Sequence, residues 1–371
     1  MIRVAEPYFD KNEIKNVTKA IRKTEISGNF GTFIKKFEDD FSNYCDVKYG
    51  VSCSSGTTAL HLAMLAIGLK KGDEVIVSSY TNMASFFSVL YTGANPIPID
   101  VDITTGNIDP NLIEKNINRK TKAILVVHIF GLIVEIEPII KIAKKYNLKI
   151  IEDCAEAHGA TYLNKKSGSF GDIGCFSFYS NKIITTGEGG MAVTNNKKLA
   201  ERMKSFKNLS FGIKNKFMHK DIGFNYRMTN IQAAIGCAQL QKLEPIIKKK
   251  IKIAKSYNNA FKHYDFIQLP ILKKNYRNVY WVYHITLLKN SPFKRNEFMN
   301  FLAKKGIETR EGFVPFDIQK NVINIKSNYY NSCINAQYLS RNSLYLPLSP
   351  MMTNKQTRYI IDTIIKFFGK Y

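Results

Sequence analysis

Residues 123–153 read AILVVHIFGLIVEIEPIIKIAKKYNLKIIED, in which two strand-like runs enclose one amphipathic helical segment. The strand-like runs are 123–128 and 149–153, and apolar residues recur at helical spacing over 137–146. A strand, a helix and a second strand at this pitch form a right-handed βαβ unit with parallel strands. Near-continuous apolar strands are typical of a parallel sheet that helices cover on both faces. This stretch therefore predicts an α/β fold.

The same alternation continues toward the N-terminus. Residues 74–77 and 96–100 are strand-like, and residues 57–67 have a helical pattern between polar turns. Repeated βαβ units imply a mainly parallel, mixed sheet flanked by helices. We assign residues 1–245, which include the N-terminal segment, to one large α/β domain.

The strand–helix alternation of the sequence ends near residue 235. A Lys-rich helical stretch covers 233–261, in which residues 248–250 are three lysines that we expect to face solvent. The elements expected beyond it are a strand at 280–287 and helices at 295–304 and 354–368. This pattern predicts a smaller C-terminal α+β domain over residues 246–371.

The composition is that of a globular protein with a strong positive charge. The chain has 371 residues, and 54 Lys+Arg against 30 Asp+Glu give a formal net charge of +24. A hydrophobic fraction of 45% excludes an intrinsically disordered chain. The lysines lie in short scattered clusters, without the concentrated arginines and interleaved aromatics of a nucleic-acid surface. We predict no nucleic-acid partner, although a positive field would attract small anionic substrates.

Cysteine usage and the absence of long apolar runs indicate the cellular setting. The six cysteines form no Cys-x-x-Cys pair and share no ligand spacing with the six histidines. Scattered cysteines suit a reducing cytoplasm. The sequence shows neither the apolar run of a signal peptide nor 18 apolar residues without charge. We therefore expect a cytoplasmic protein with no metal site and no membrane partner.

A first candidate for ligand binding is the segment 54–60, which reads SSGTTAL and leads from a strand-like run into a helix. The start of a helix offers free N–H groups and the positive end of the helix dipole to an anion. Gly56 permits close approach of the backbone, and the Thr57 hydroxyl adds a hydrogen bond. A plain helix cap would use the same residue types.

Two further segments carry an acid and a lysine. Residues 150–159, IIEDCAEAHG, end a buried strand in carboxylates at the edge where α/β sheets bind ligands. Asp153 there is suited to hold a proton on a heterocyclic nitrogen, or else caps a turn. Residues 177–190, SFYSNKIITTGEGG, place Lys182 in an apolar setting, where desolvation makes a lysine a Schiff-base nucleophile. A phosphate cup, an acid and a sheltered lysine together match the needs of pyridoxal 5′-phosphate (PLP).

These segments closely resemble the DegT/DnrJ/StrS family of PLP-dependent sugar aminotransferases, and the resemblance covers nearly the whole chain. The segments that carry it are 55–62, 152–160, 168–172, 181–190 and 223–230. The resemblance implies fold type I of the aspartate aminotransferase superfamily. Residues 181–190 and 225–236 look most like the perosamine synthase branch of the family.

The resemblance also implies roles for single residues. Lys182 would form the Schiff base and carry protons, and Asp153 would bond the pyridine nitrogen. Glu156 would lie beside the phenolic oxygen of the cofactor. The ligands of the cofactor phosphate would be Gly56, Thr57 and Ser177.

Other implied roles belong to the substrate and to a second subunit. Asn230 would reach the phosphate of the partner subunit, which implies a homodimer with shared active sites, and an N-cap role for Asn230 is compatible with this. His219 would lie near the entrance of the active site. Arg310 and Phe313 belong to a loop that lies near the substrate in the family.

The sequence departs from the family where many relatives place an aromatic ring over the cofactor. The matching position here is Asn82. Ring stacking would therefore be lost or moved to Tyr80 or Phe86. Tyr80 and Asn82 both remain candidates for contact with the cofactor.

We predict an aminotransferase that moves an amino group, with L-glutamate as donor, to an anionic keto substrate. The first acceptor is a nucleotide-linked 4-keto-6-deoxy sugar for surface polysaccharide, either capsule or lipopolysaccharide. The loop 310–317 departs from the family pattern at Glu311 and Asp317. This departure and the strong positive charge leave open an alternative acceptor, a small phosphorylated ketone such as dihydroxyacetone phosphate, which would give serinol phosphate. A PLP-fold protein without aminotransferase activity is a further alternative, against which Lys182 argues.

Overall fold

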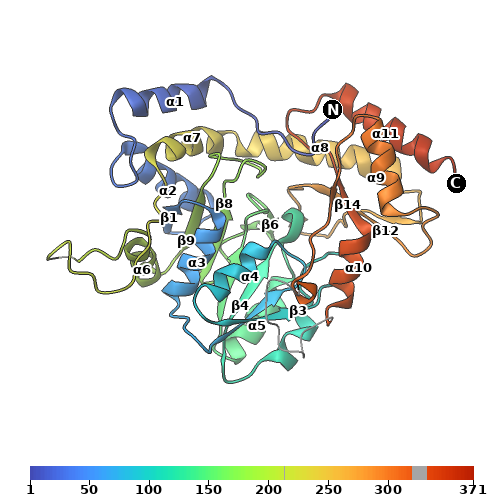
Figure 1. Ribbon diagram of the computed structural model, residues 1–371. Coiled ribbons are helices and arrows are strands. Elements are labelled where there is room, and N and C mark those ends of the chain that lie inside the picture. Colours follow the sequence, from blue (N-terminus) through green and yellow to red (C-terminus); the bar gives the residue numbers. More distant parts are fainter. Residues whose placement is uncertain (213, 320–331) are drawn as a thin grey trace.

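A seven-stranded sheet forms the centre of the computed structural model, which describes residues 1–212, 214–319 and 332–371 (Figure 1). In spatial order the strands are β1 (Tyr49–Cys53), β9 (Gly190–Thr194), β8 (Ile173–Ser177), β5 (Lys149–Asp153), β4 (Thr121–Val127), β2 (Glu74–Ser78) and β3 (Asn95–Ile99). Only β9 runs antiparallel to its neighbours, while the other neighbouring strands are parallel. The predicted mainly parallel, mixed sheet is confirmed.

Helices cover both faces of this sheet (Figure 1). One face packs against α3 (Gly56–Ala66), α4 (Met83–Leu90) and α6 (Lys197–Lys207). The helices on the other side are α1 (Lys11–Arg22), α2 (Thr32–Tyr44), α5 (Ile136–Lys145) and α7 (Asn230–Gln241). Because both faces are covered, the central strands are buried along almost their whole length, which explains their apolar sequences.

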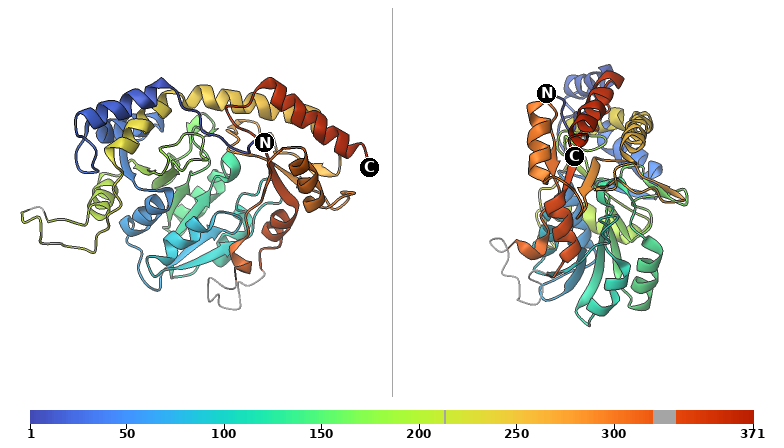
Figure 2. Two further views of the ribbon diagram at one scale, coloured as in Figure 1. Left: turned by 45° about the horizontal axis from the view of Figure 1, so that its top comes forward. Right: turned by 90° about the vertical axis from the view of Figure 1, so that its right-hand side faces the viewer.

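The C-terminal third forms a second, antiparallel sheet with its own core. Its strands are β10 (Ile267–Gln268), β12 (Tyr283–Leu287), β14 (Ser343–Leu346) and β13 (Arg310–Glu311). Its helices are α9 (Arg295–Lys304), α10 (Ile334–Asn342) and α11 (Asn354–Phe368). A short third sheet joins β11 (Tyr276–Arg277), β6 (Thr161–Tyr162) and β7 (Lys165–Lys166). The C-terminal α+β composition is as predicted, and Figure 2 shows this part beside the central sheet.

The helix predicted over 233–261 is two helices, α7 and α8 (Leu243–Phe261). The break at Lys242 has a local cause. Pro245 has no N–H for the Gln241 carbonyl and its ring would collide with that carbonyl, so it is accepted only in the first turn of a new helix. The domain boundary expected at residue 245 falls inside α8 and stays a prediction.

One of the three lysines predicted to face solvent is buried. Lys250 is 3% exposed and donates from Nζ to the Leu348 carbonyl at 2.6 Å. Helical spacing puts it on the same face as Ile246 and Ile253, which belong to the core. Its neighbours Lys248 and Lys249 do face solvent.

Two more differences concern the ends of elements. The strand predicted over 280–287 begins only at Tyr283, because Tyr280 is left-handed with φ +50°. The N-terminal segment, expected in the large domain, lies against the C-terminal part, where Ile2 bridges Ile307. Among the described residues, no helix combines the length and apolar character needed to cross a membrane.

Candidate active site

A pocket of about 430 Å³ lies where the carboxyl ends of β4, β5 and β8 meet the start of α3. This is the edge at which open α/β sheets bind ligands. The predicted residues that line it are Gly56, Thr57, Asn82, Asp153, Glu156, Ser177, Lys182, Arg310 and Phe313. The predicted residues that line this cavity lie up to 257 residues apart in the sequence.

One end of the pocket is the beginning of α3. Ser55 caps the helix, and its side chain accepts from the Thr58 N–H at 3.2 Å. Within the described part of the chain, the N–H groups of Gly56 and Thr57 remain available to an anion. A Cβ on Gly56 would lie 2.6 Å from Cβ of Ser177, so only glycine lets the helix start this close to β8. The capping and the anion-binding interpretations of this segment are therefore compatible.

Asp153 ends β5 on the pocket side and is 6% exposed. Its carboxylate accepts from the Ser85 hydroxyl at 2.8 Å and from the Ala155 N–H at 3.1 Å. Burial raises its pKa, and the two hydrogen bonds together with Lys182 oppose that rise. The carboxylate is thus held in one orientation and keeps lone pairs for a cationic N–H in the pocket.

Lys182 lies across the pocket with 12% of its side chain exposed. Burial lowers its pKa, which the charges of Glu156 and Asp153 partly offset. Its Nζ lies 4.0 Å from Oε1 of Glu156 and 4.1 Å from the ring centroid of Trp281. A lysine in such a setting gains access to its neutral, nucleophilic form.

Glu156 follows β5 and completes this charged group. Its Oε2 accepts from the Phe130 N–H at 2.8 Å. Burial raises its pKa to about 7, while Lys182 and the Phe130 hydrogen bond act in the opposite direction. Near neutral pH the carboxyl group is therefore able to donate or accept a hydrogen bond in the pocket.

The proposed replacements for the missing aromatic ring do not line the pocket. Tyr80 is 1% exposed and packs edge-on against Phe130. Phe86 stacks on Phe316 at a centroid distance of 3.9 Å. Asn82 does line the pocket, but its side chain caps α4. The expectation of ring stacking by Tyr80 or Phe86 therefore has no support in this geometry.

Two aromatic residues from the C-terminal part of the chain line the pocket and were given no role from the sequence. They are Trp281 and Tyr345, which approach from the C-terminal part of the chain. The signal for Trp281 was present, because it is the single tryptophan of the chain. The contact of Trp281 with the pocket could not be predicted from the sequence, because Trp281 is far from most other pocket residues along the chain.

Asn230 is bound within its own chain. Its Oδ1 accepts from the N–H groups of Phe33 and Ile34, and its Nδ2 donates to the Glu25 carbonyl. The N-cap of α7 is Thr229, which corrects the N-cap interpretation of Asn230. Contact with a partner's phosphate stays a prediction, and it would require these three bonds to open.

His219 does not line the pocket of its own chain. It is exposed, and its Nδ1 hydrogen-bonds the Leu209 carbonyl at 2.7 Å. The described residues around it, between α6 and α7, extend away from the rest of the chain (Figures 1 and 2). A role for His219 near the entrance of an active site stays a prediction.

The residues of the loop 310–317, which departs from the family pattern, lie in two different environments. Arg310 and Glu311 line the pocket, and each is paired, Arg310 with Glu308 at 3.2 Å and Glu311 with Arg295 at 3.0 Å. Phe313 also lines the pocket, parallel to Trp281 within 7°.

Asp317, the other departure, is fully buried outside the pocket. It accepts from the Cys333 N–H at 3.0 Å and from the Gln337 amide at 2.8 Å. It therefore holds the loop to α10, and it is not a contact for the substrate.

The pocket fits PLP by the chemistry of its donors. The start of α3 faces a phosphate, the oriented Asp153 suits a protonated ring nitrogen, and Lys182 supplies the amine. The Asn181 Oδ1 and the Tyr345 hydroxyl are buried without a hydrogen-bond partner among the described residues. Such unpaired polar atoms are expected where a polar ligand completes the site.

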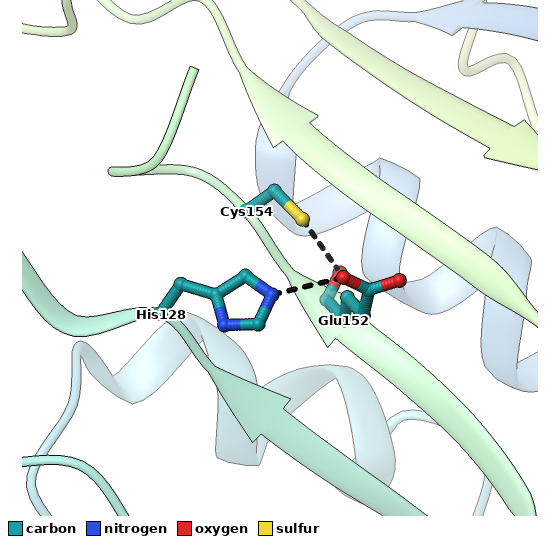
Figure 3. Close-up of side chains that lie close together, drawn as sticks. All are labelled: His128, Glu152 and Cys154. Atoms are coloured by element: carbon teal, nitrogen blue, oxygen red, sulfur yellow. Dashed lines mark hydrogen bonds and ion pairs between the residues drawn. The ribbon is translucent and has the colours of Figure 1, made fainter. Parts of the chain in front are cut away.

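A second cluster of ionisable groups lies at the same strand end (Figure 3). Atoms of His128, Glu152 and Cys154 lie within 4.8 Å of one another. The Glu152 carboxylate accepts from His128 Nε2 at 2.9 Å and from three backbone N–H groups. These groups belong to Gly168, Phe170 and Gly171. Four hydrogen bonds occupy the carboxylate, so the cluster is a structural network, and we still expect no metal there.

Comparisons with known proteins agree with this geometry. The model of the DegT/DnrJ/EryC1/StrS aminotransferase family matches residues 7–365. A GDP-perosamine synthase of Escherichia coli O157:H7 is 41% identical over 368 residues, 99% of each chain. A GDP-perosamine synthase of Caulobacter vibrioides is 43% identical over 85% of each chain. An aminotransferase structure from Psychrobacter cryohalolentis superposes with a TM-score of 0.92, at 30% identity over 98% of each chain.

The fold and the pocket define an aminotransferase of fold type I, as predicted. The chain belongs to the DegT/DnrJ/EryC1/StrS aminotransferase family.

Proposed function

We propose that this enzyme transfers an amino group from L-glutamate to the 4-keto group of a GDP-linked 4-keto-6-deoxy sugar, with PLP as cofactor. The observation that carries the proposal is the 41% identity to a GDP-perosamine synthase over 99% of both chains. The pocket supports it with an anion-binding helix start, an oriented acid and a sheltered lysine in one cavity. The product would serve surface polysaccharide synthesis.

The chain's own residues would hold the cofactor at both ends. Gly56, Thr57 and Ser177 would bind its phosphate, where the helix dipole adds favourable charge. Asp153 would bond the ring nitrogen and keep it protonated, because Ser85 and the Ala155 N–H fix the carboxylate. When bound, PLP supplies the carbonyl that carries the amino group and a ring that accepts electrons from the reacting carbon.

Lys182 would move the proton. Its lowered pKa makes the neutral amine available, and the short distance to Glu156 gives the protonated form a counter-charge. Glu156, with a pKa of about 7, would hydrogen-bond the phenolic oxygen of the cofactor. Arg310, Phe313 and Glu311 would meet the sugar nucleotide at the open side of the pocket.

The alternative acceptor, dihydroxyacetone phosphate, is not favoured. It rests on the positive charge of the chain and on the departures at Glu311 and Asp317, of which Asp317 lies outside the pocket. The comparisons favour a nucleotide sugar. The buried, free cysteines fit the expected cytoplasmic location.

A half-reaction screen tests the acceptor. Enzyme converted with L-glutamate to its amino-loaded form is mixed with a GDP-linked or dTDP-linked 4-keto-6-deoxy sugar, or with dihydroxyacetone phosphate. We expect rapid recovery of the visible absorbance only with the GDP sugar. Recovery with dihydroxyacetone phosphate alone would contradict the proposal.

We also propose a homodimer with shared active sites. The described residues between α6 and α7 include Phe217, Met218 and Ile222, which are 76%, 67% and 85% exposed. Apolar side chains on a projecting segment indicate a protein partner. Since His219 lies on this segment and outside its own pocket, it would serve the pocket of the second subunit.

Mixed dimers test this arrangement. Lys182→Ala and His219→Ala proteins are purified separately, then unfolded, mixed and refolded. If the sites are shared, a mixed dimer has one intact site, and the mixture recovers about one quarter of the wild-type activity. Light scattering measures the dimer itself, and mixtures without recovery would place His219 outside the partner's site.

A further inference from the structure

Two segments that are far apart in sequence cross beside the pocket. The N–H of Val279 donates to the Gly131 carbonyl at 3.2 Å, and the N–H of Trp281 donates to the Phe130 carbonyl at 3.0 Å. A Cβ on Gly131, which has φ +98°, would lie 2.8 Å from Cγ2 of Val279. The crossing thus depends on backbone contact that only glycine permits.

The backbone at this crossing has an unfavourable conformation at two bulky residues. Phe130 has φ +55° and Tyr280 has φ +50°. Left-handed conformations are rare for aromatic residues and persist only when the surrounding structure holds them. At Phe130 this conformation accompanies the N–H bond to Glu156, and Tyr280 directly precedes Trp281.

Trp281 makes two contacts with the segment that carries Lys182. Its indole N–H donates to the Asn181 carbonyl at 2.8 Å. The centroid of its ring lies 4.1 Å from Nζ of Lys182. Among the described residues Nζ has no hydrogen bond, so the ring face and Glu156 are the groups that hold the amine.

We propose that Trp281 is a positioning residue for Lys182. Its indole N–H fixes the backbone beside the lysine, and its ring face holds the ammonium group toward the pocket. The C-terminal part of the chain thereby sets the geometry of the catalytic lysine. The link to catalysis rests on the proposed function, whereas the contact itself belongs to the protein without cofactor.

A residue that only fills space would need neither contact. An apolar core position is satisfied by area alone, and methionine or leucine would suffice. Here the one polar atom of the side chain and its negative ring face are both directed at residues 181–182. The replacement of tryptophan by phenylalanine and by leucine separates these two contacts.

The first test uses cofactor-free protein. An amine-acylating reagent is applied across a pH series, and mass spectrometry of the Lys182 peptide gives the pKa of that lysine. We expect Trp281→Leu to lower this pKa by roughly 0.5–1.5 pH units, because the ring no longer stabilises the ammonium form. Trp281→Phe keeps a ring face and should retain most of the wild-type value.

Tyr345→Phe is the matched control. It changes the same wall of the pocket and removes only a hydroxyl that has no partner among the described residues. It should leave the pKa of Lys182 unchanged. An unchanged or higher pKa in Trp281→Leu would show that the indole only excludes water and would overturn the proposal.

A second measurement needs no substitution of Trp281. Because Trp281 is the single tryptophan of the chain, its fluorescence reports on this site alone. In cofactor-free wild-type protein the emission should titrate with the pKa of Lys182, and Lys182→Ala should abolish that titration. Emission that ignores Lys182 would contradict the contact.

The two proposals fail in different ways. If PLP does not bind, but Trp281→Leu moves the pKa of Lys182 in cofactor-free protein, the proposed function fails and the role of Trp281 stands. If PLP binds through Lys182 and transfers amino groups, but neither the pKa nor the emission responds, only the role of Trp281 fails.

Discussion

Glu152 and Asp153 are adjacent in sequence at the end of the same buried strand, yet they occupy opposite environments. Successive side chains of a strand point to opposite faces of the sheet. Glu152 turns to the α5 side, where four donors occupy its carboxylate. Asp153 turns to the α3 side, where two donors fix its carboxylate. The other lone pairs of this carboxylate face the pocket and stay free for a ligand. Whether a buried carboxylate can bind a ligand therefore depends on how many of its lone pairs already accept hydrogen bonds within the protein.

The largest expected effect on activity comes from a substitution in the pocket that Asp153 faces. Lys182→Ala should reduce transamination by about 10⁴-fold, because the residue that moves the proton is lost. The visible absorbance of PLP-treated protein should disappear, as measured by spectrophotometry. Lys250→Met removes a lysine that is buried outside the pocket and serves as the control, in which the absorbance should remain. Absorbance that survives in Lys182→Ala would assign the cofactor to another lysine.

Asp153→Asn should lower the rate of the amino-donor half-reaction by about 10³-fold, since an amide cannot supply negative charge to a protonated ring nitrogen. The free energy of unfolding should change little, because the amide oxygen still accepts from Ser85 or Ala155. Stopped-flow absorbance with L-glutamate measures the first effect and urea unfolding the second. Full activity in this variant would remove Asp153 from the mechanism.

Glu152→Gln should lower the stability of the fold, in contrast to Asp153→Asn, which should lower activity. The amide nitrogen would face N–H donors, leaving buried groups unpaired at a cost of about 3–4 kcal/mol in the free energy of unfolding. Urea unfolding at neutral pH measures this cost.

Addition of zinc tests whether the Glu152 carboxylate is fully occupied by hydrogen bonds. If His128, Glu152 and Cys154 are only a structural network, neither zinc nor a chelator should move the melting temperature of the wild-type protein. A clear rise with zinc would show that the carboxylate is less occupied than its four hydrogen bonds indicate.

Another expected effect concerns Glu156 and the pH dependence of stability. Burial raises its pKa from 4.5 to about 7, so the folded protein retains a proton that the unfolded chain has lost between these values. Stability from this group is therefore lost as pH rises through that window. Relative to Glu156→Gln, cofactor-free wild-type protein should lose about 3 kcal/mol between pH 4.5 and pH 7. Parallel pH profiles from urea unfolding would contradict the shifted pKa.

The sequence alone determined the fold class and much of the pocket. Strand–helix periodicity fixes which segments are buried strands, and parallel connectivity brings their carboxyl ends to one edge. Asp153 could therefore be placed at that edge, whereas Gly56 and Lys182 were joined to it by the chemical needs of PLP and by the family resemblance. The helix predicted over 354–368 is confirmed, and the structure shows that Thr353 and Gln356 form a capping box at its start.

Only the tertiary structure decided how the polar groups are satisfied. The burial of Lys250 and the internal bonds of Asn230 depend on partners from 98 to 205 residues away. Asp317 lies outside the pocket because Cys333 and Gln337 donate to its carboxylate, as does the distant Ser79 hydroxyl. The same holds for Trp281, which reaches Lys182 only because the C-terminal part packs on the pocket. Local sequence records the period of an element and its caps, whereas long-range packing assigns each hydrogen bond, and these bonds separate the structural carboxylate Glu152 from the open one at Asp153.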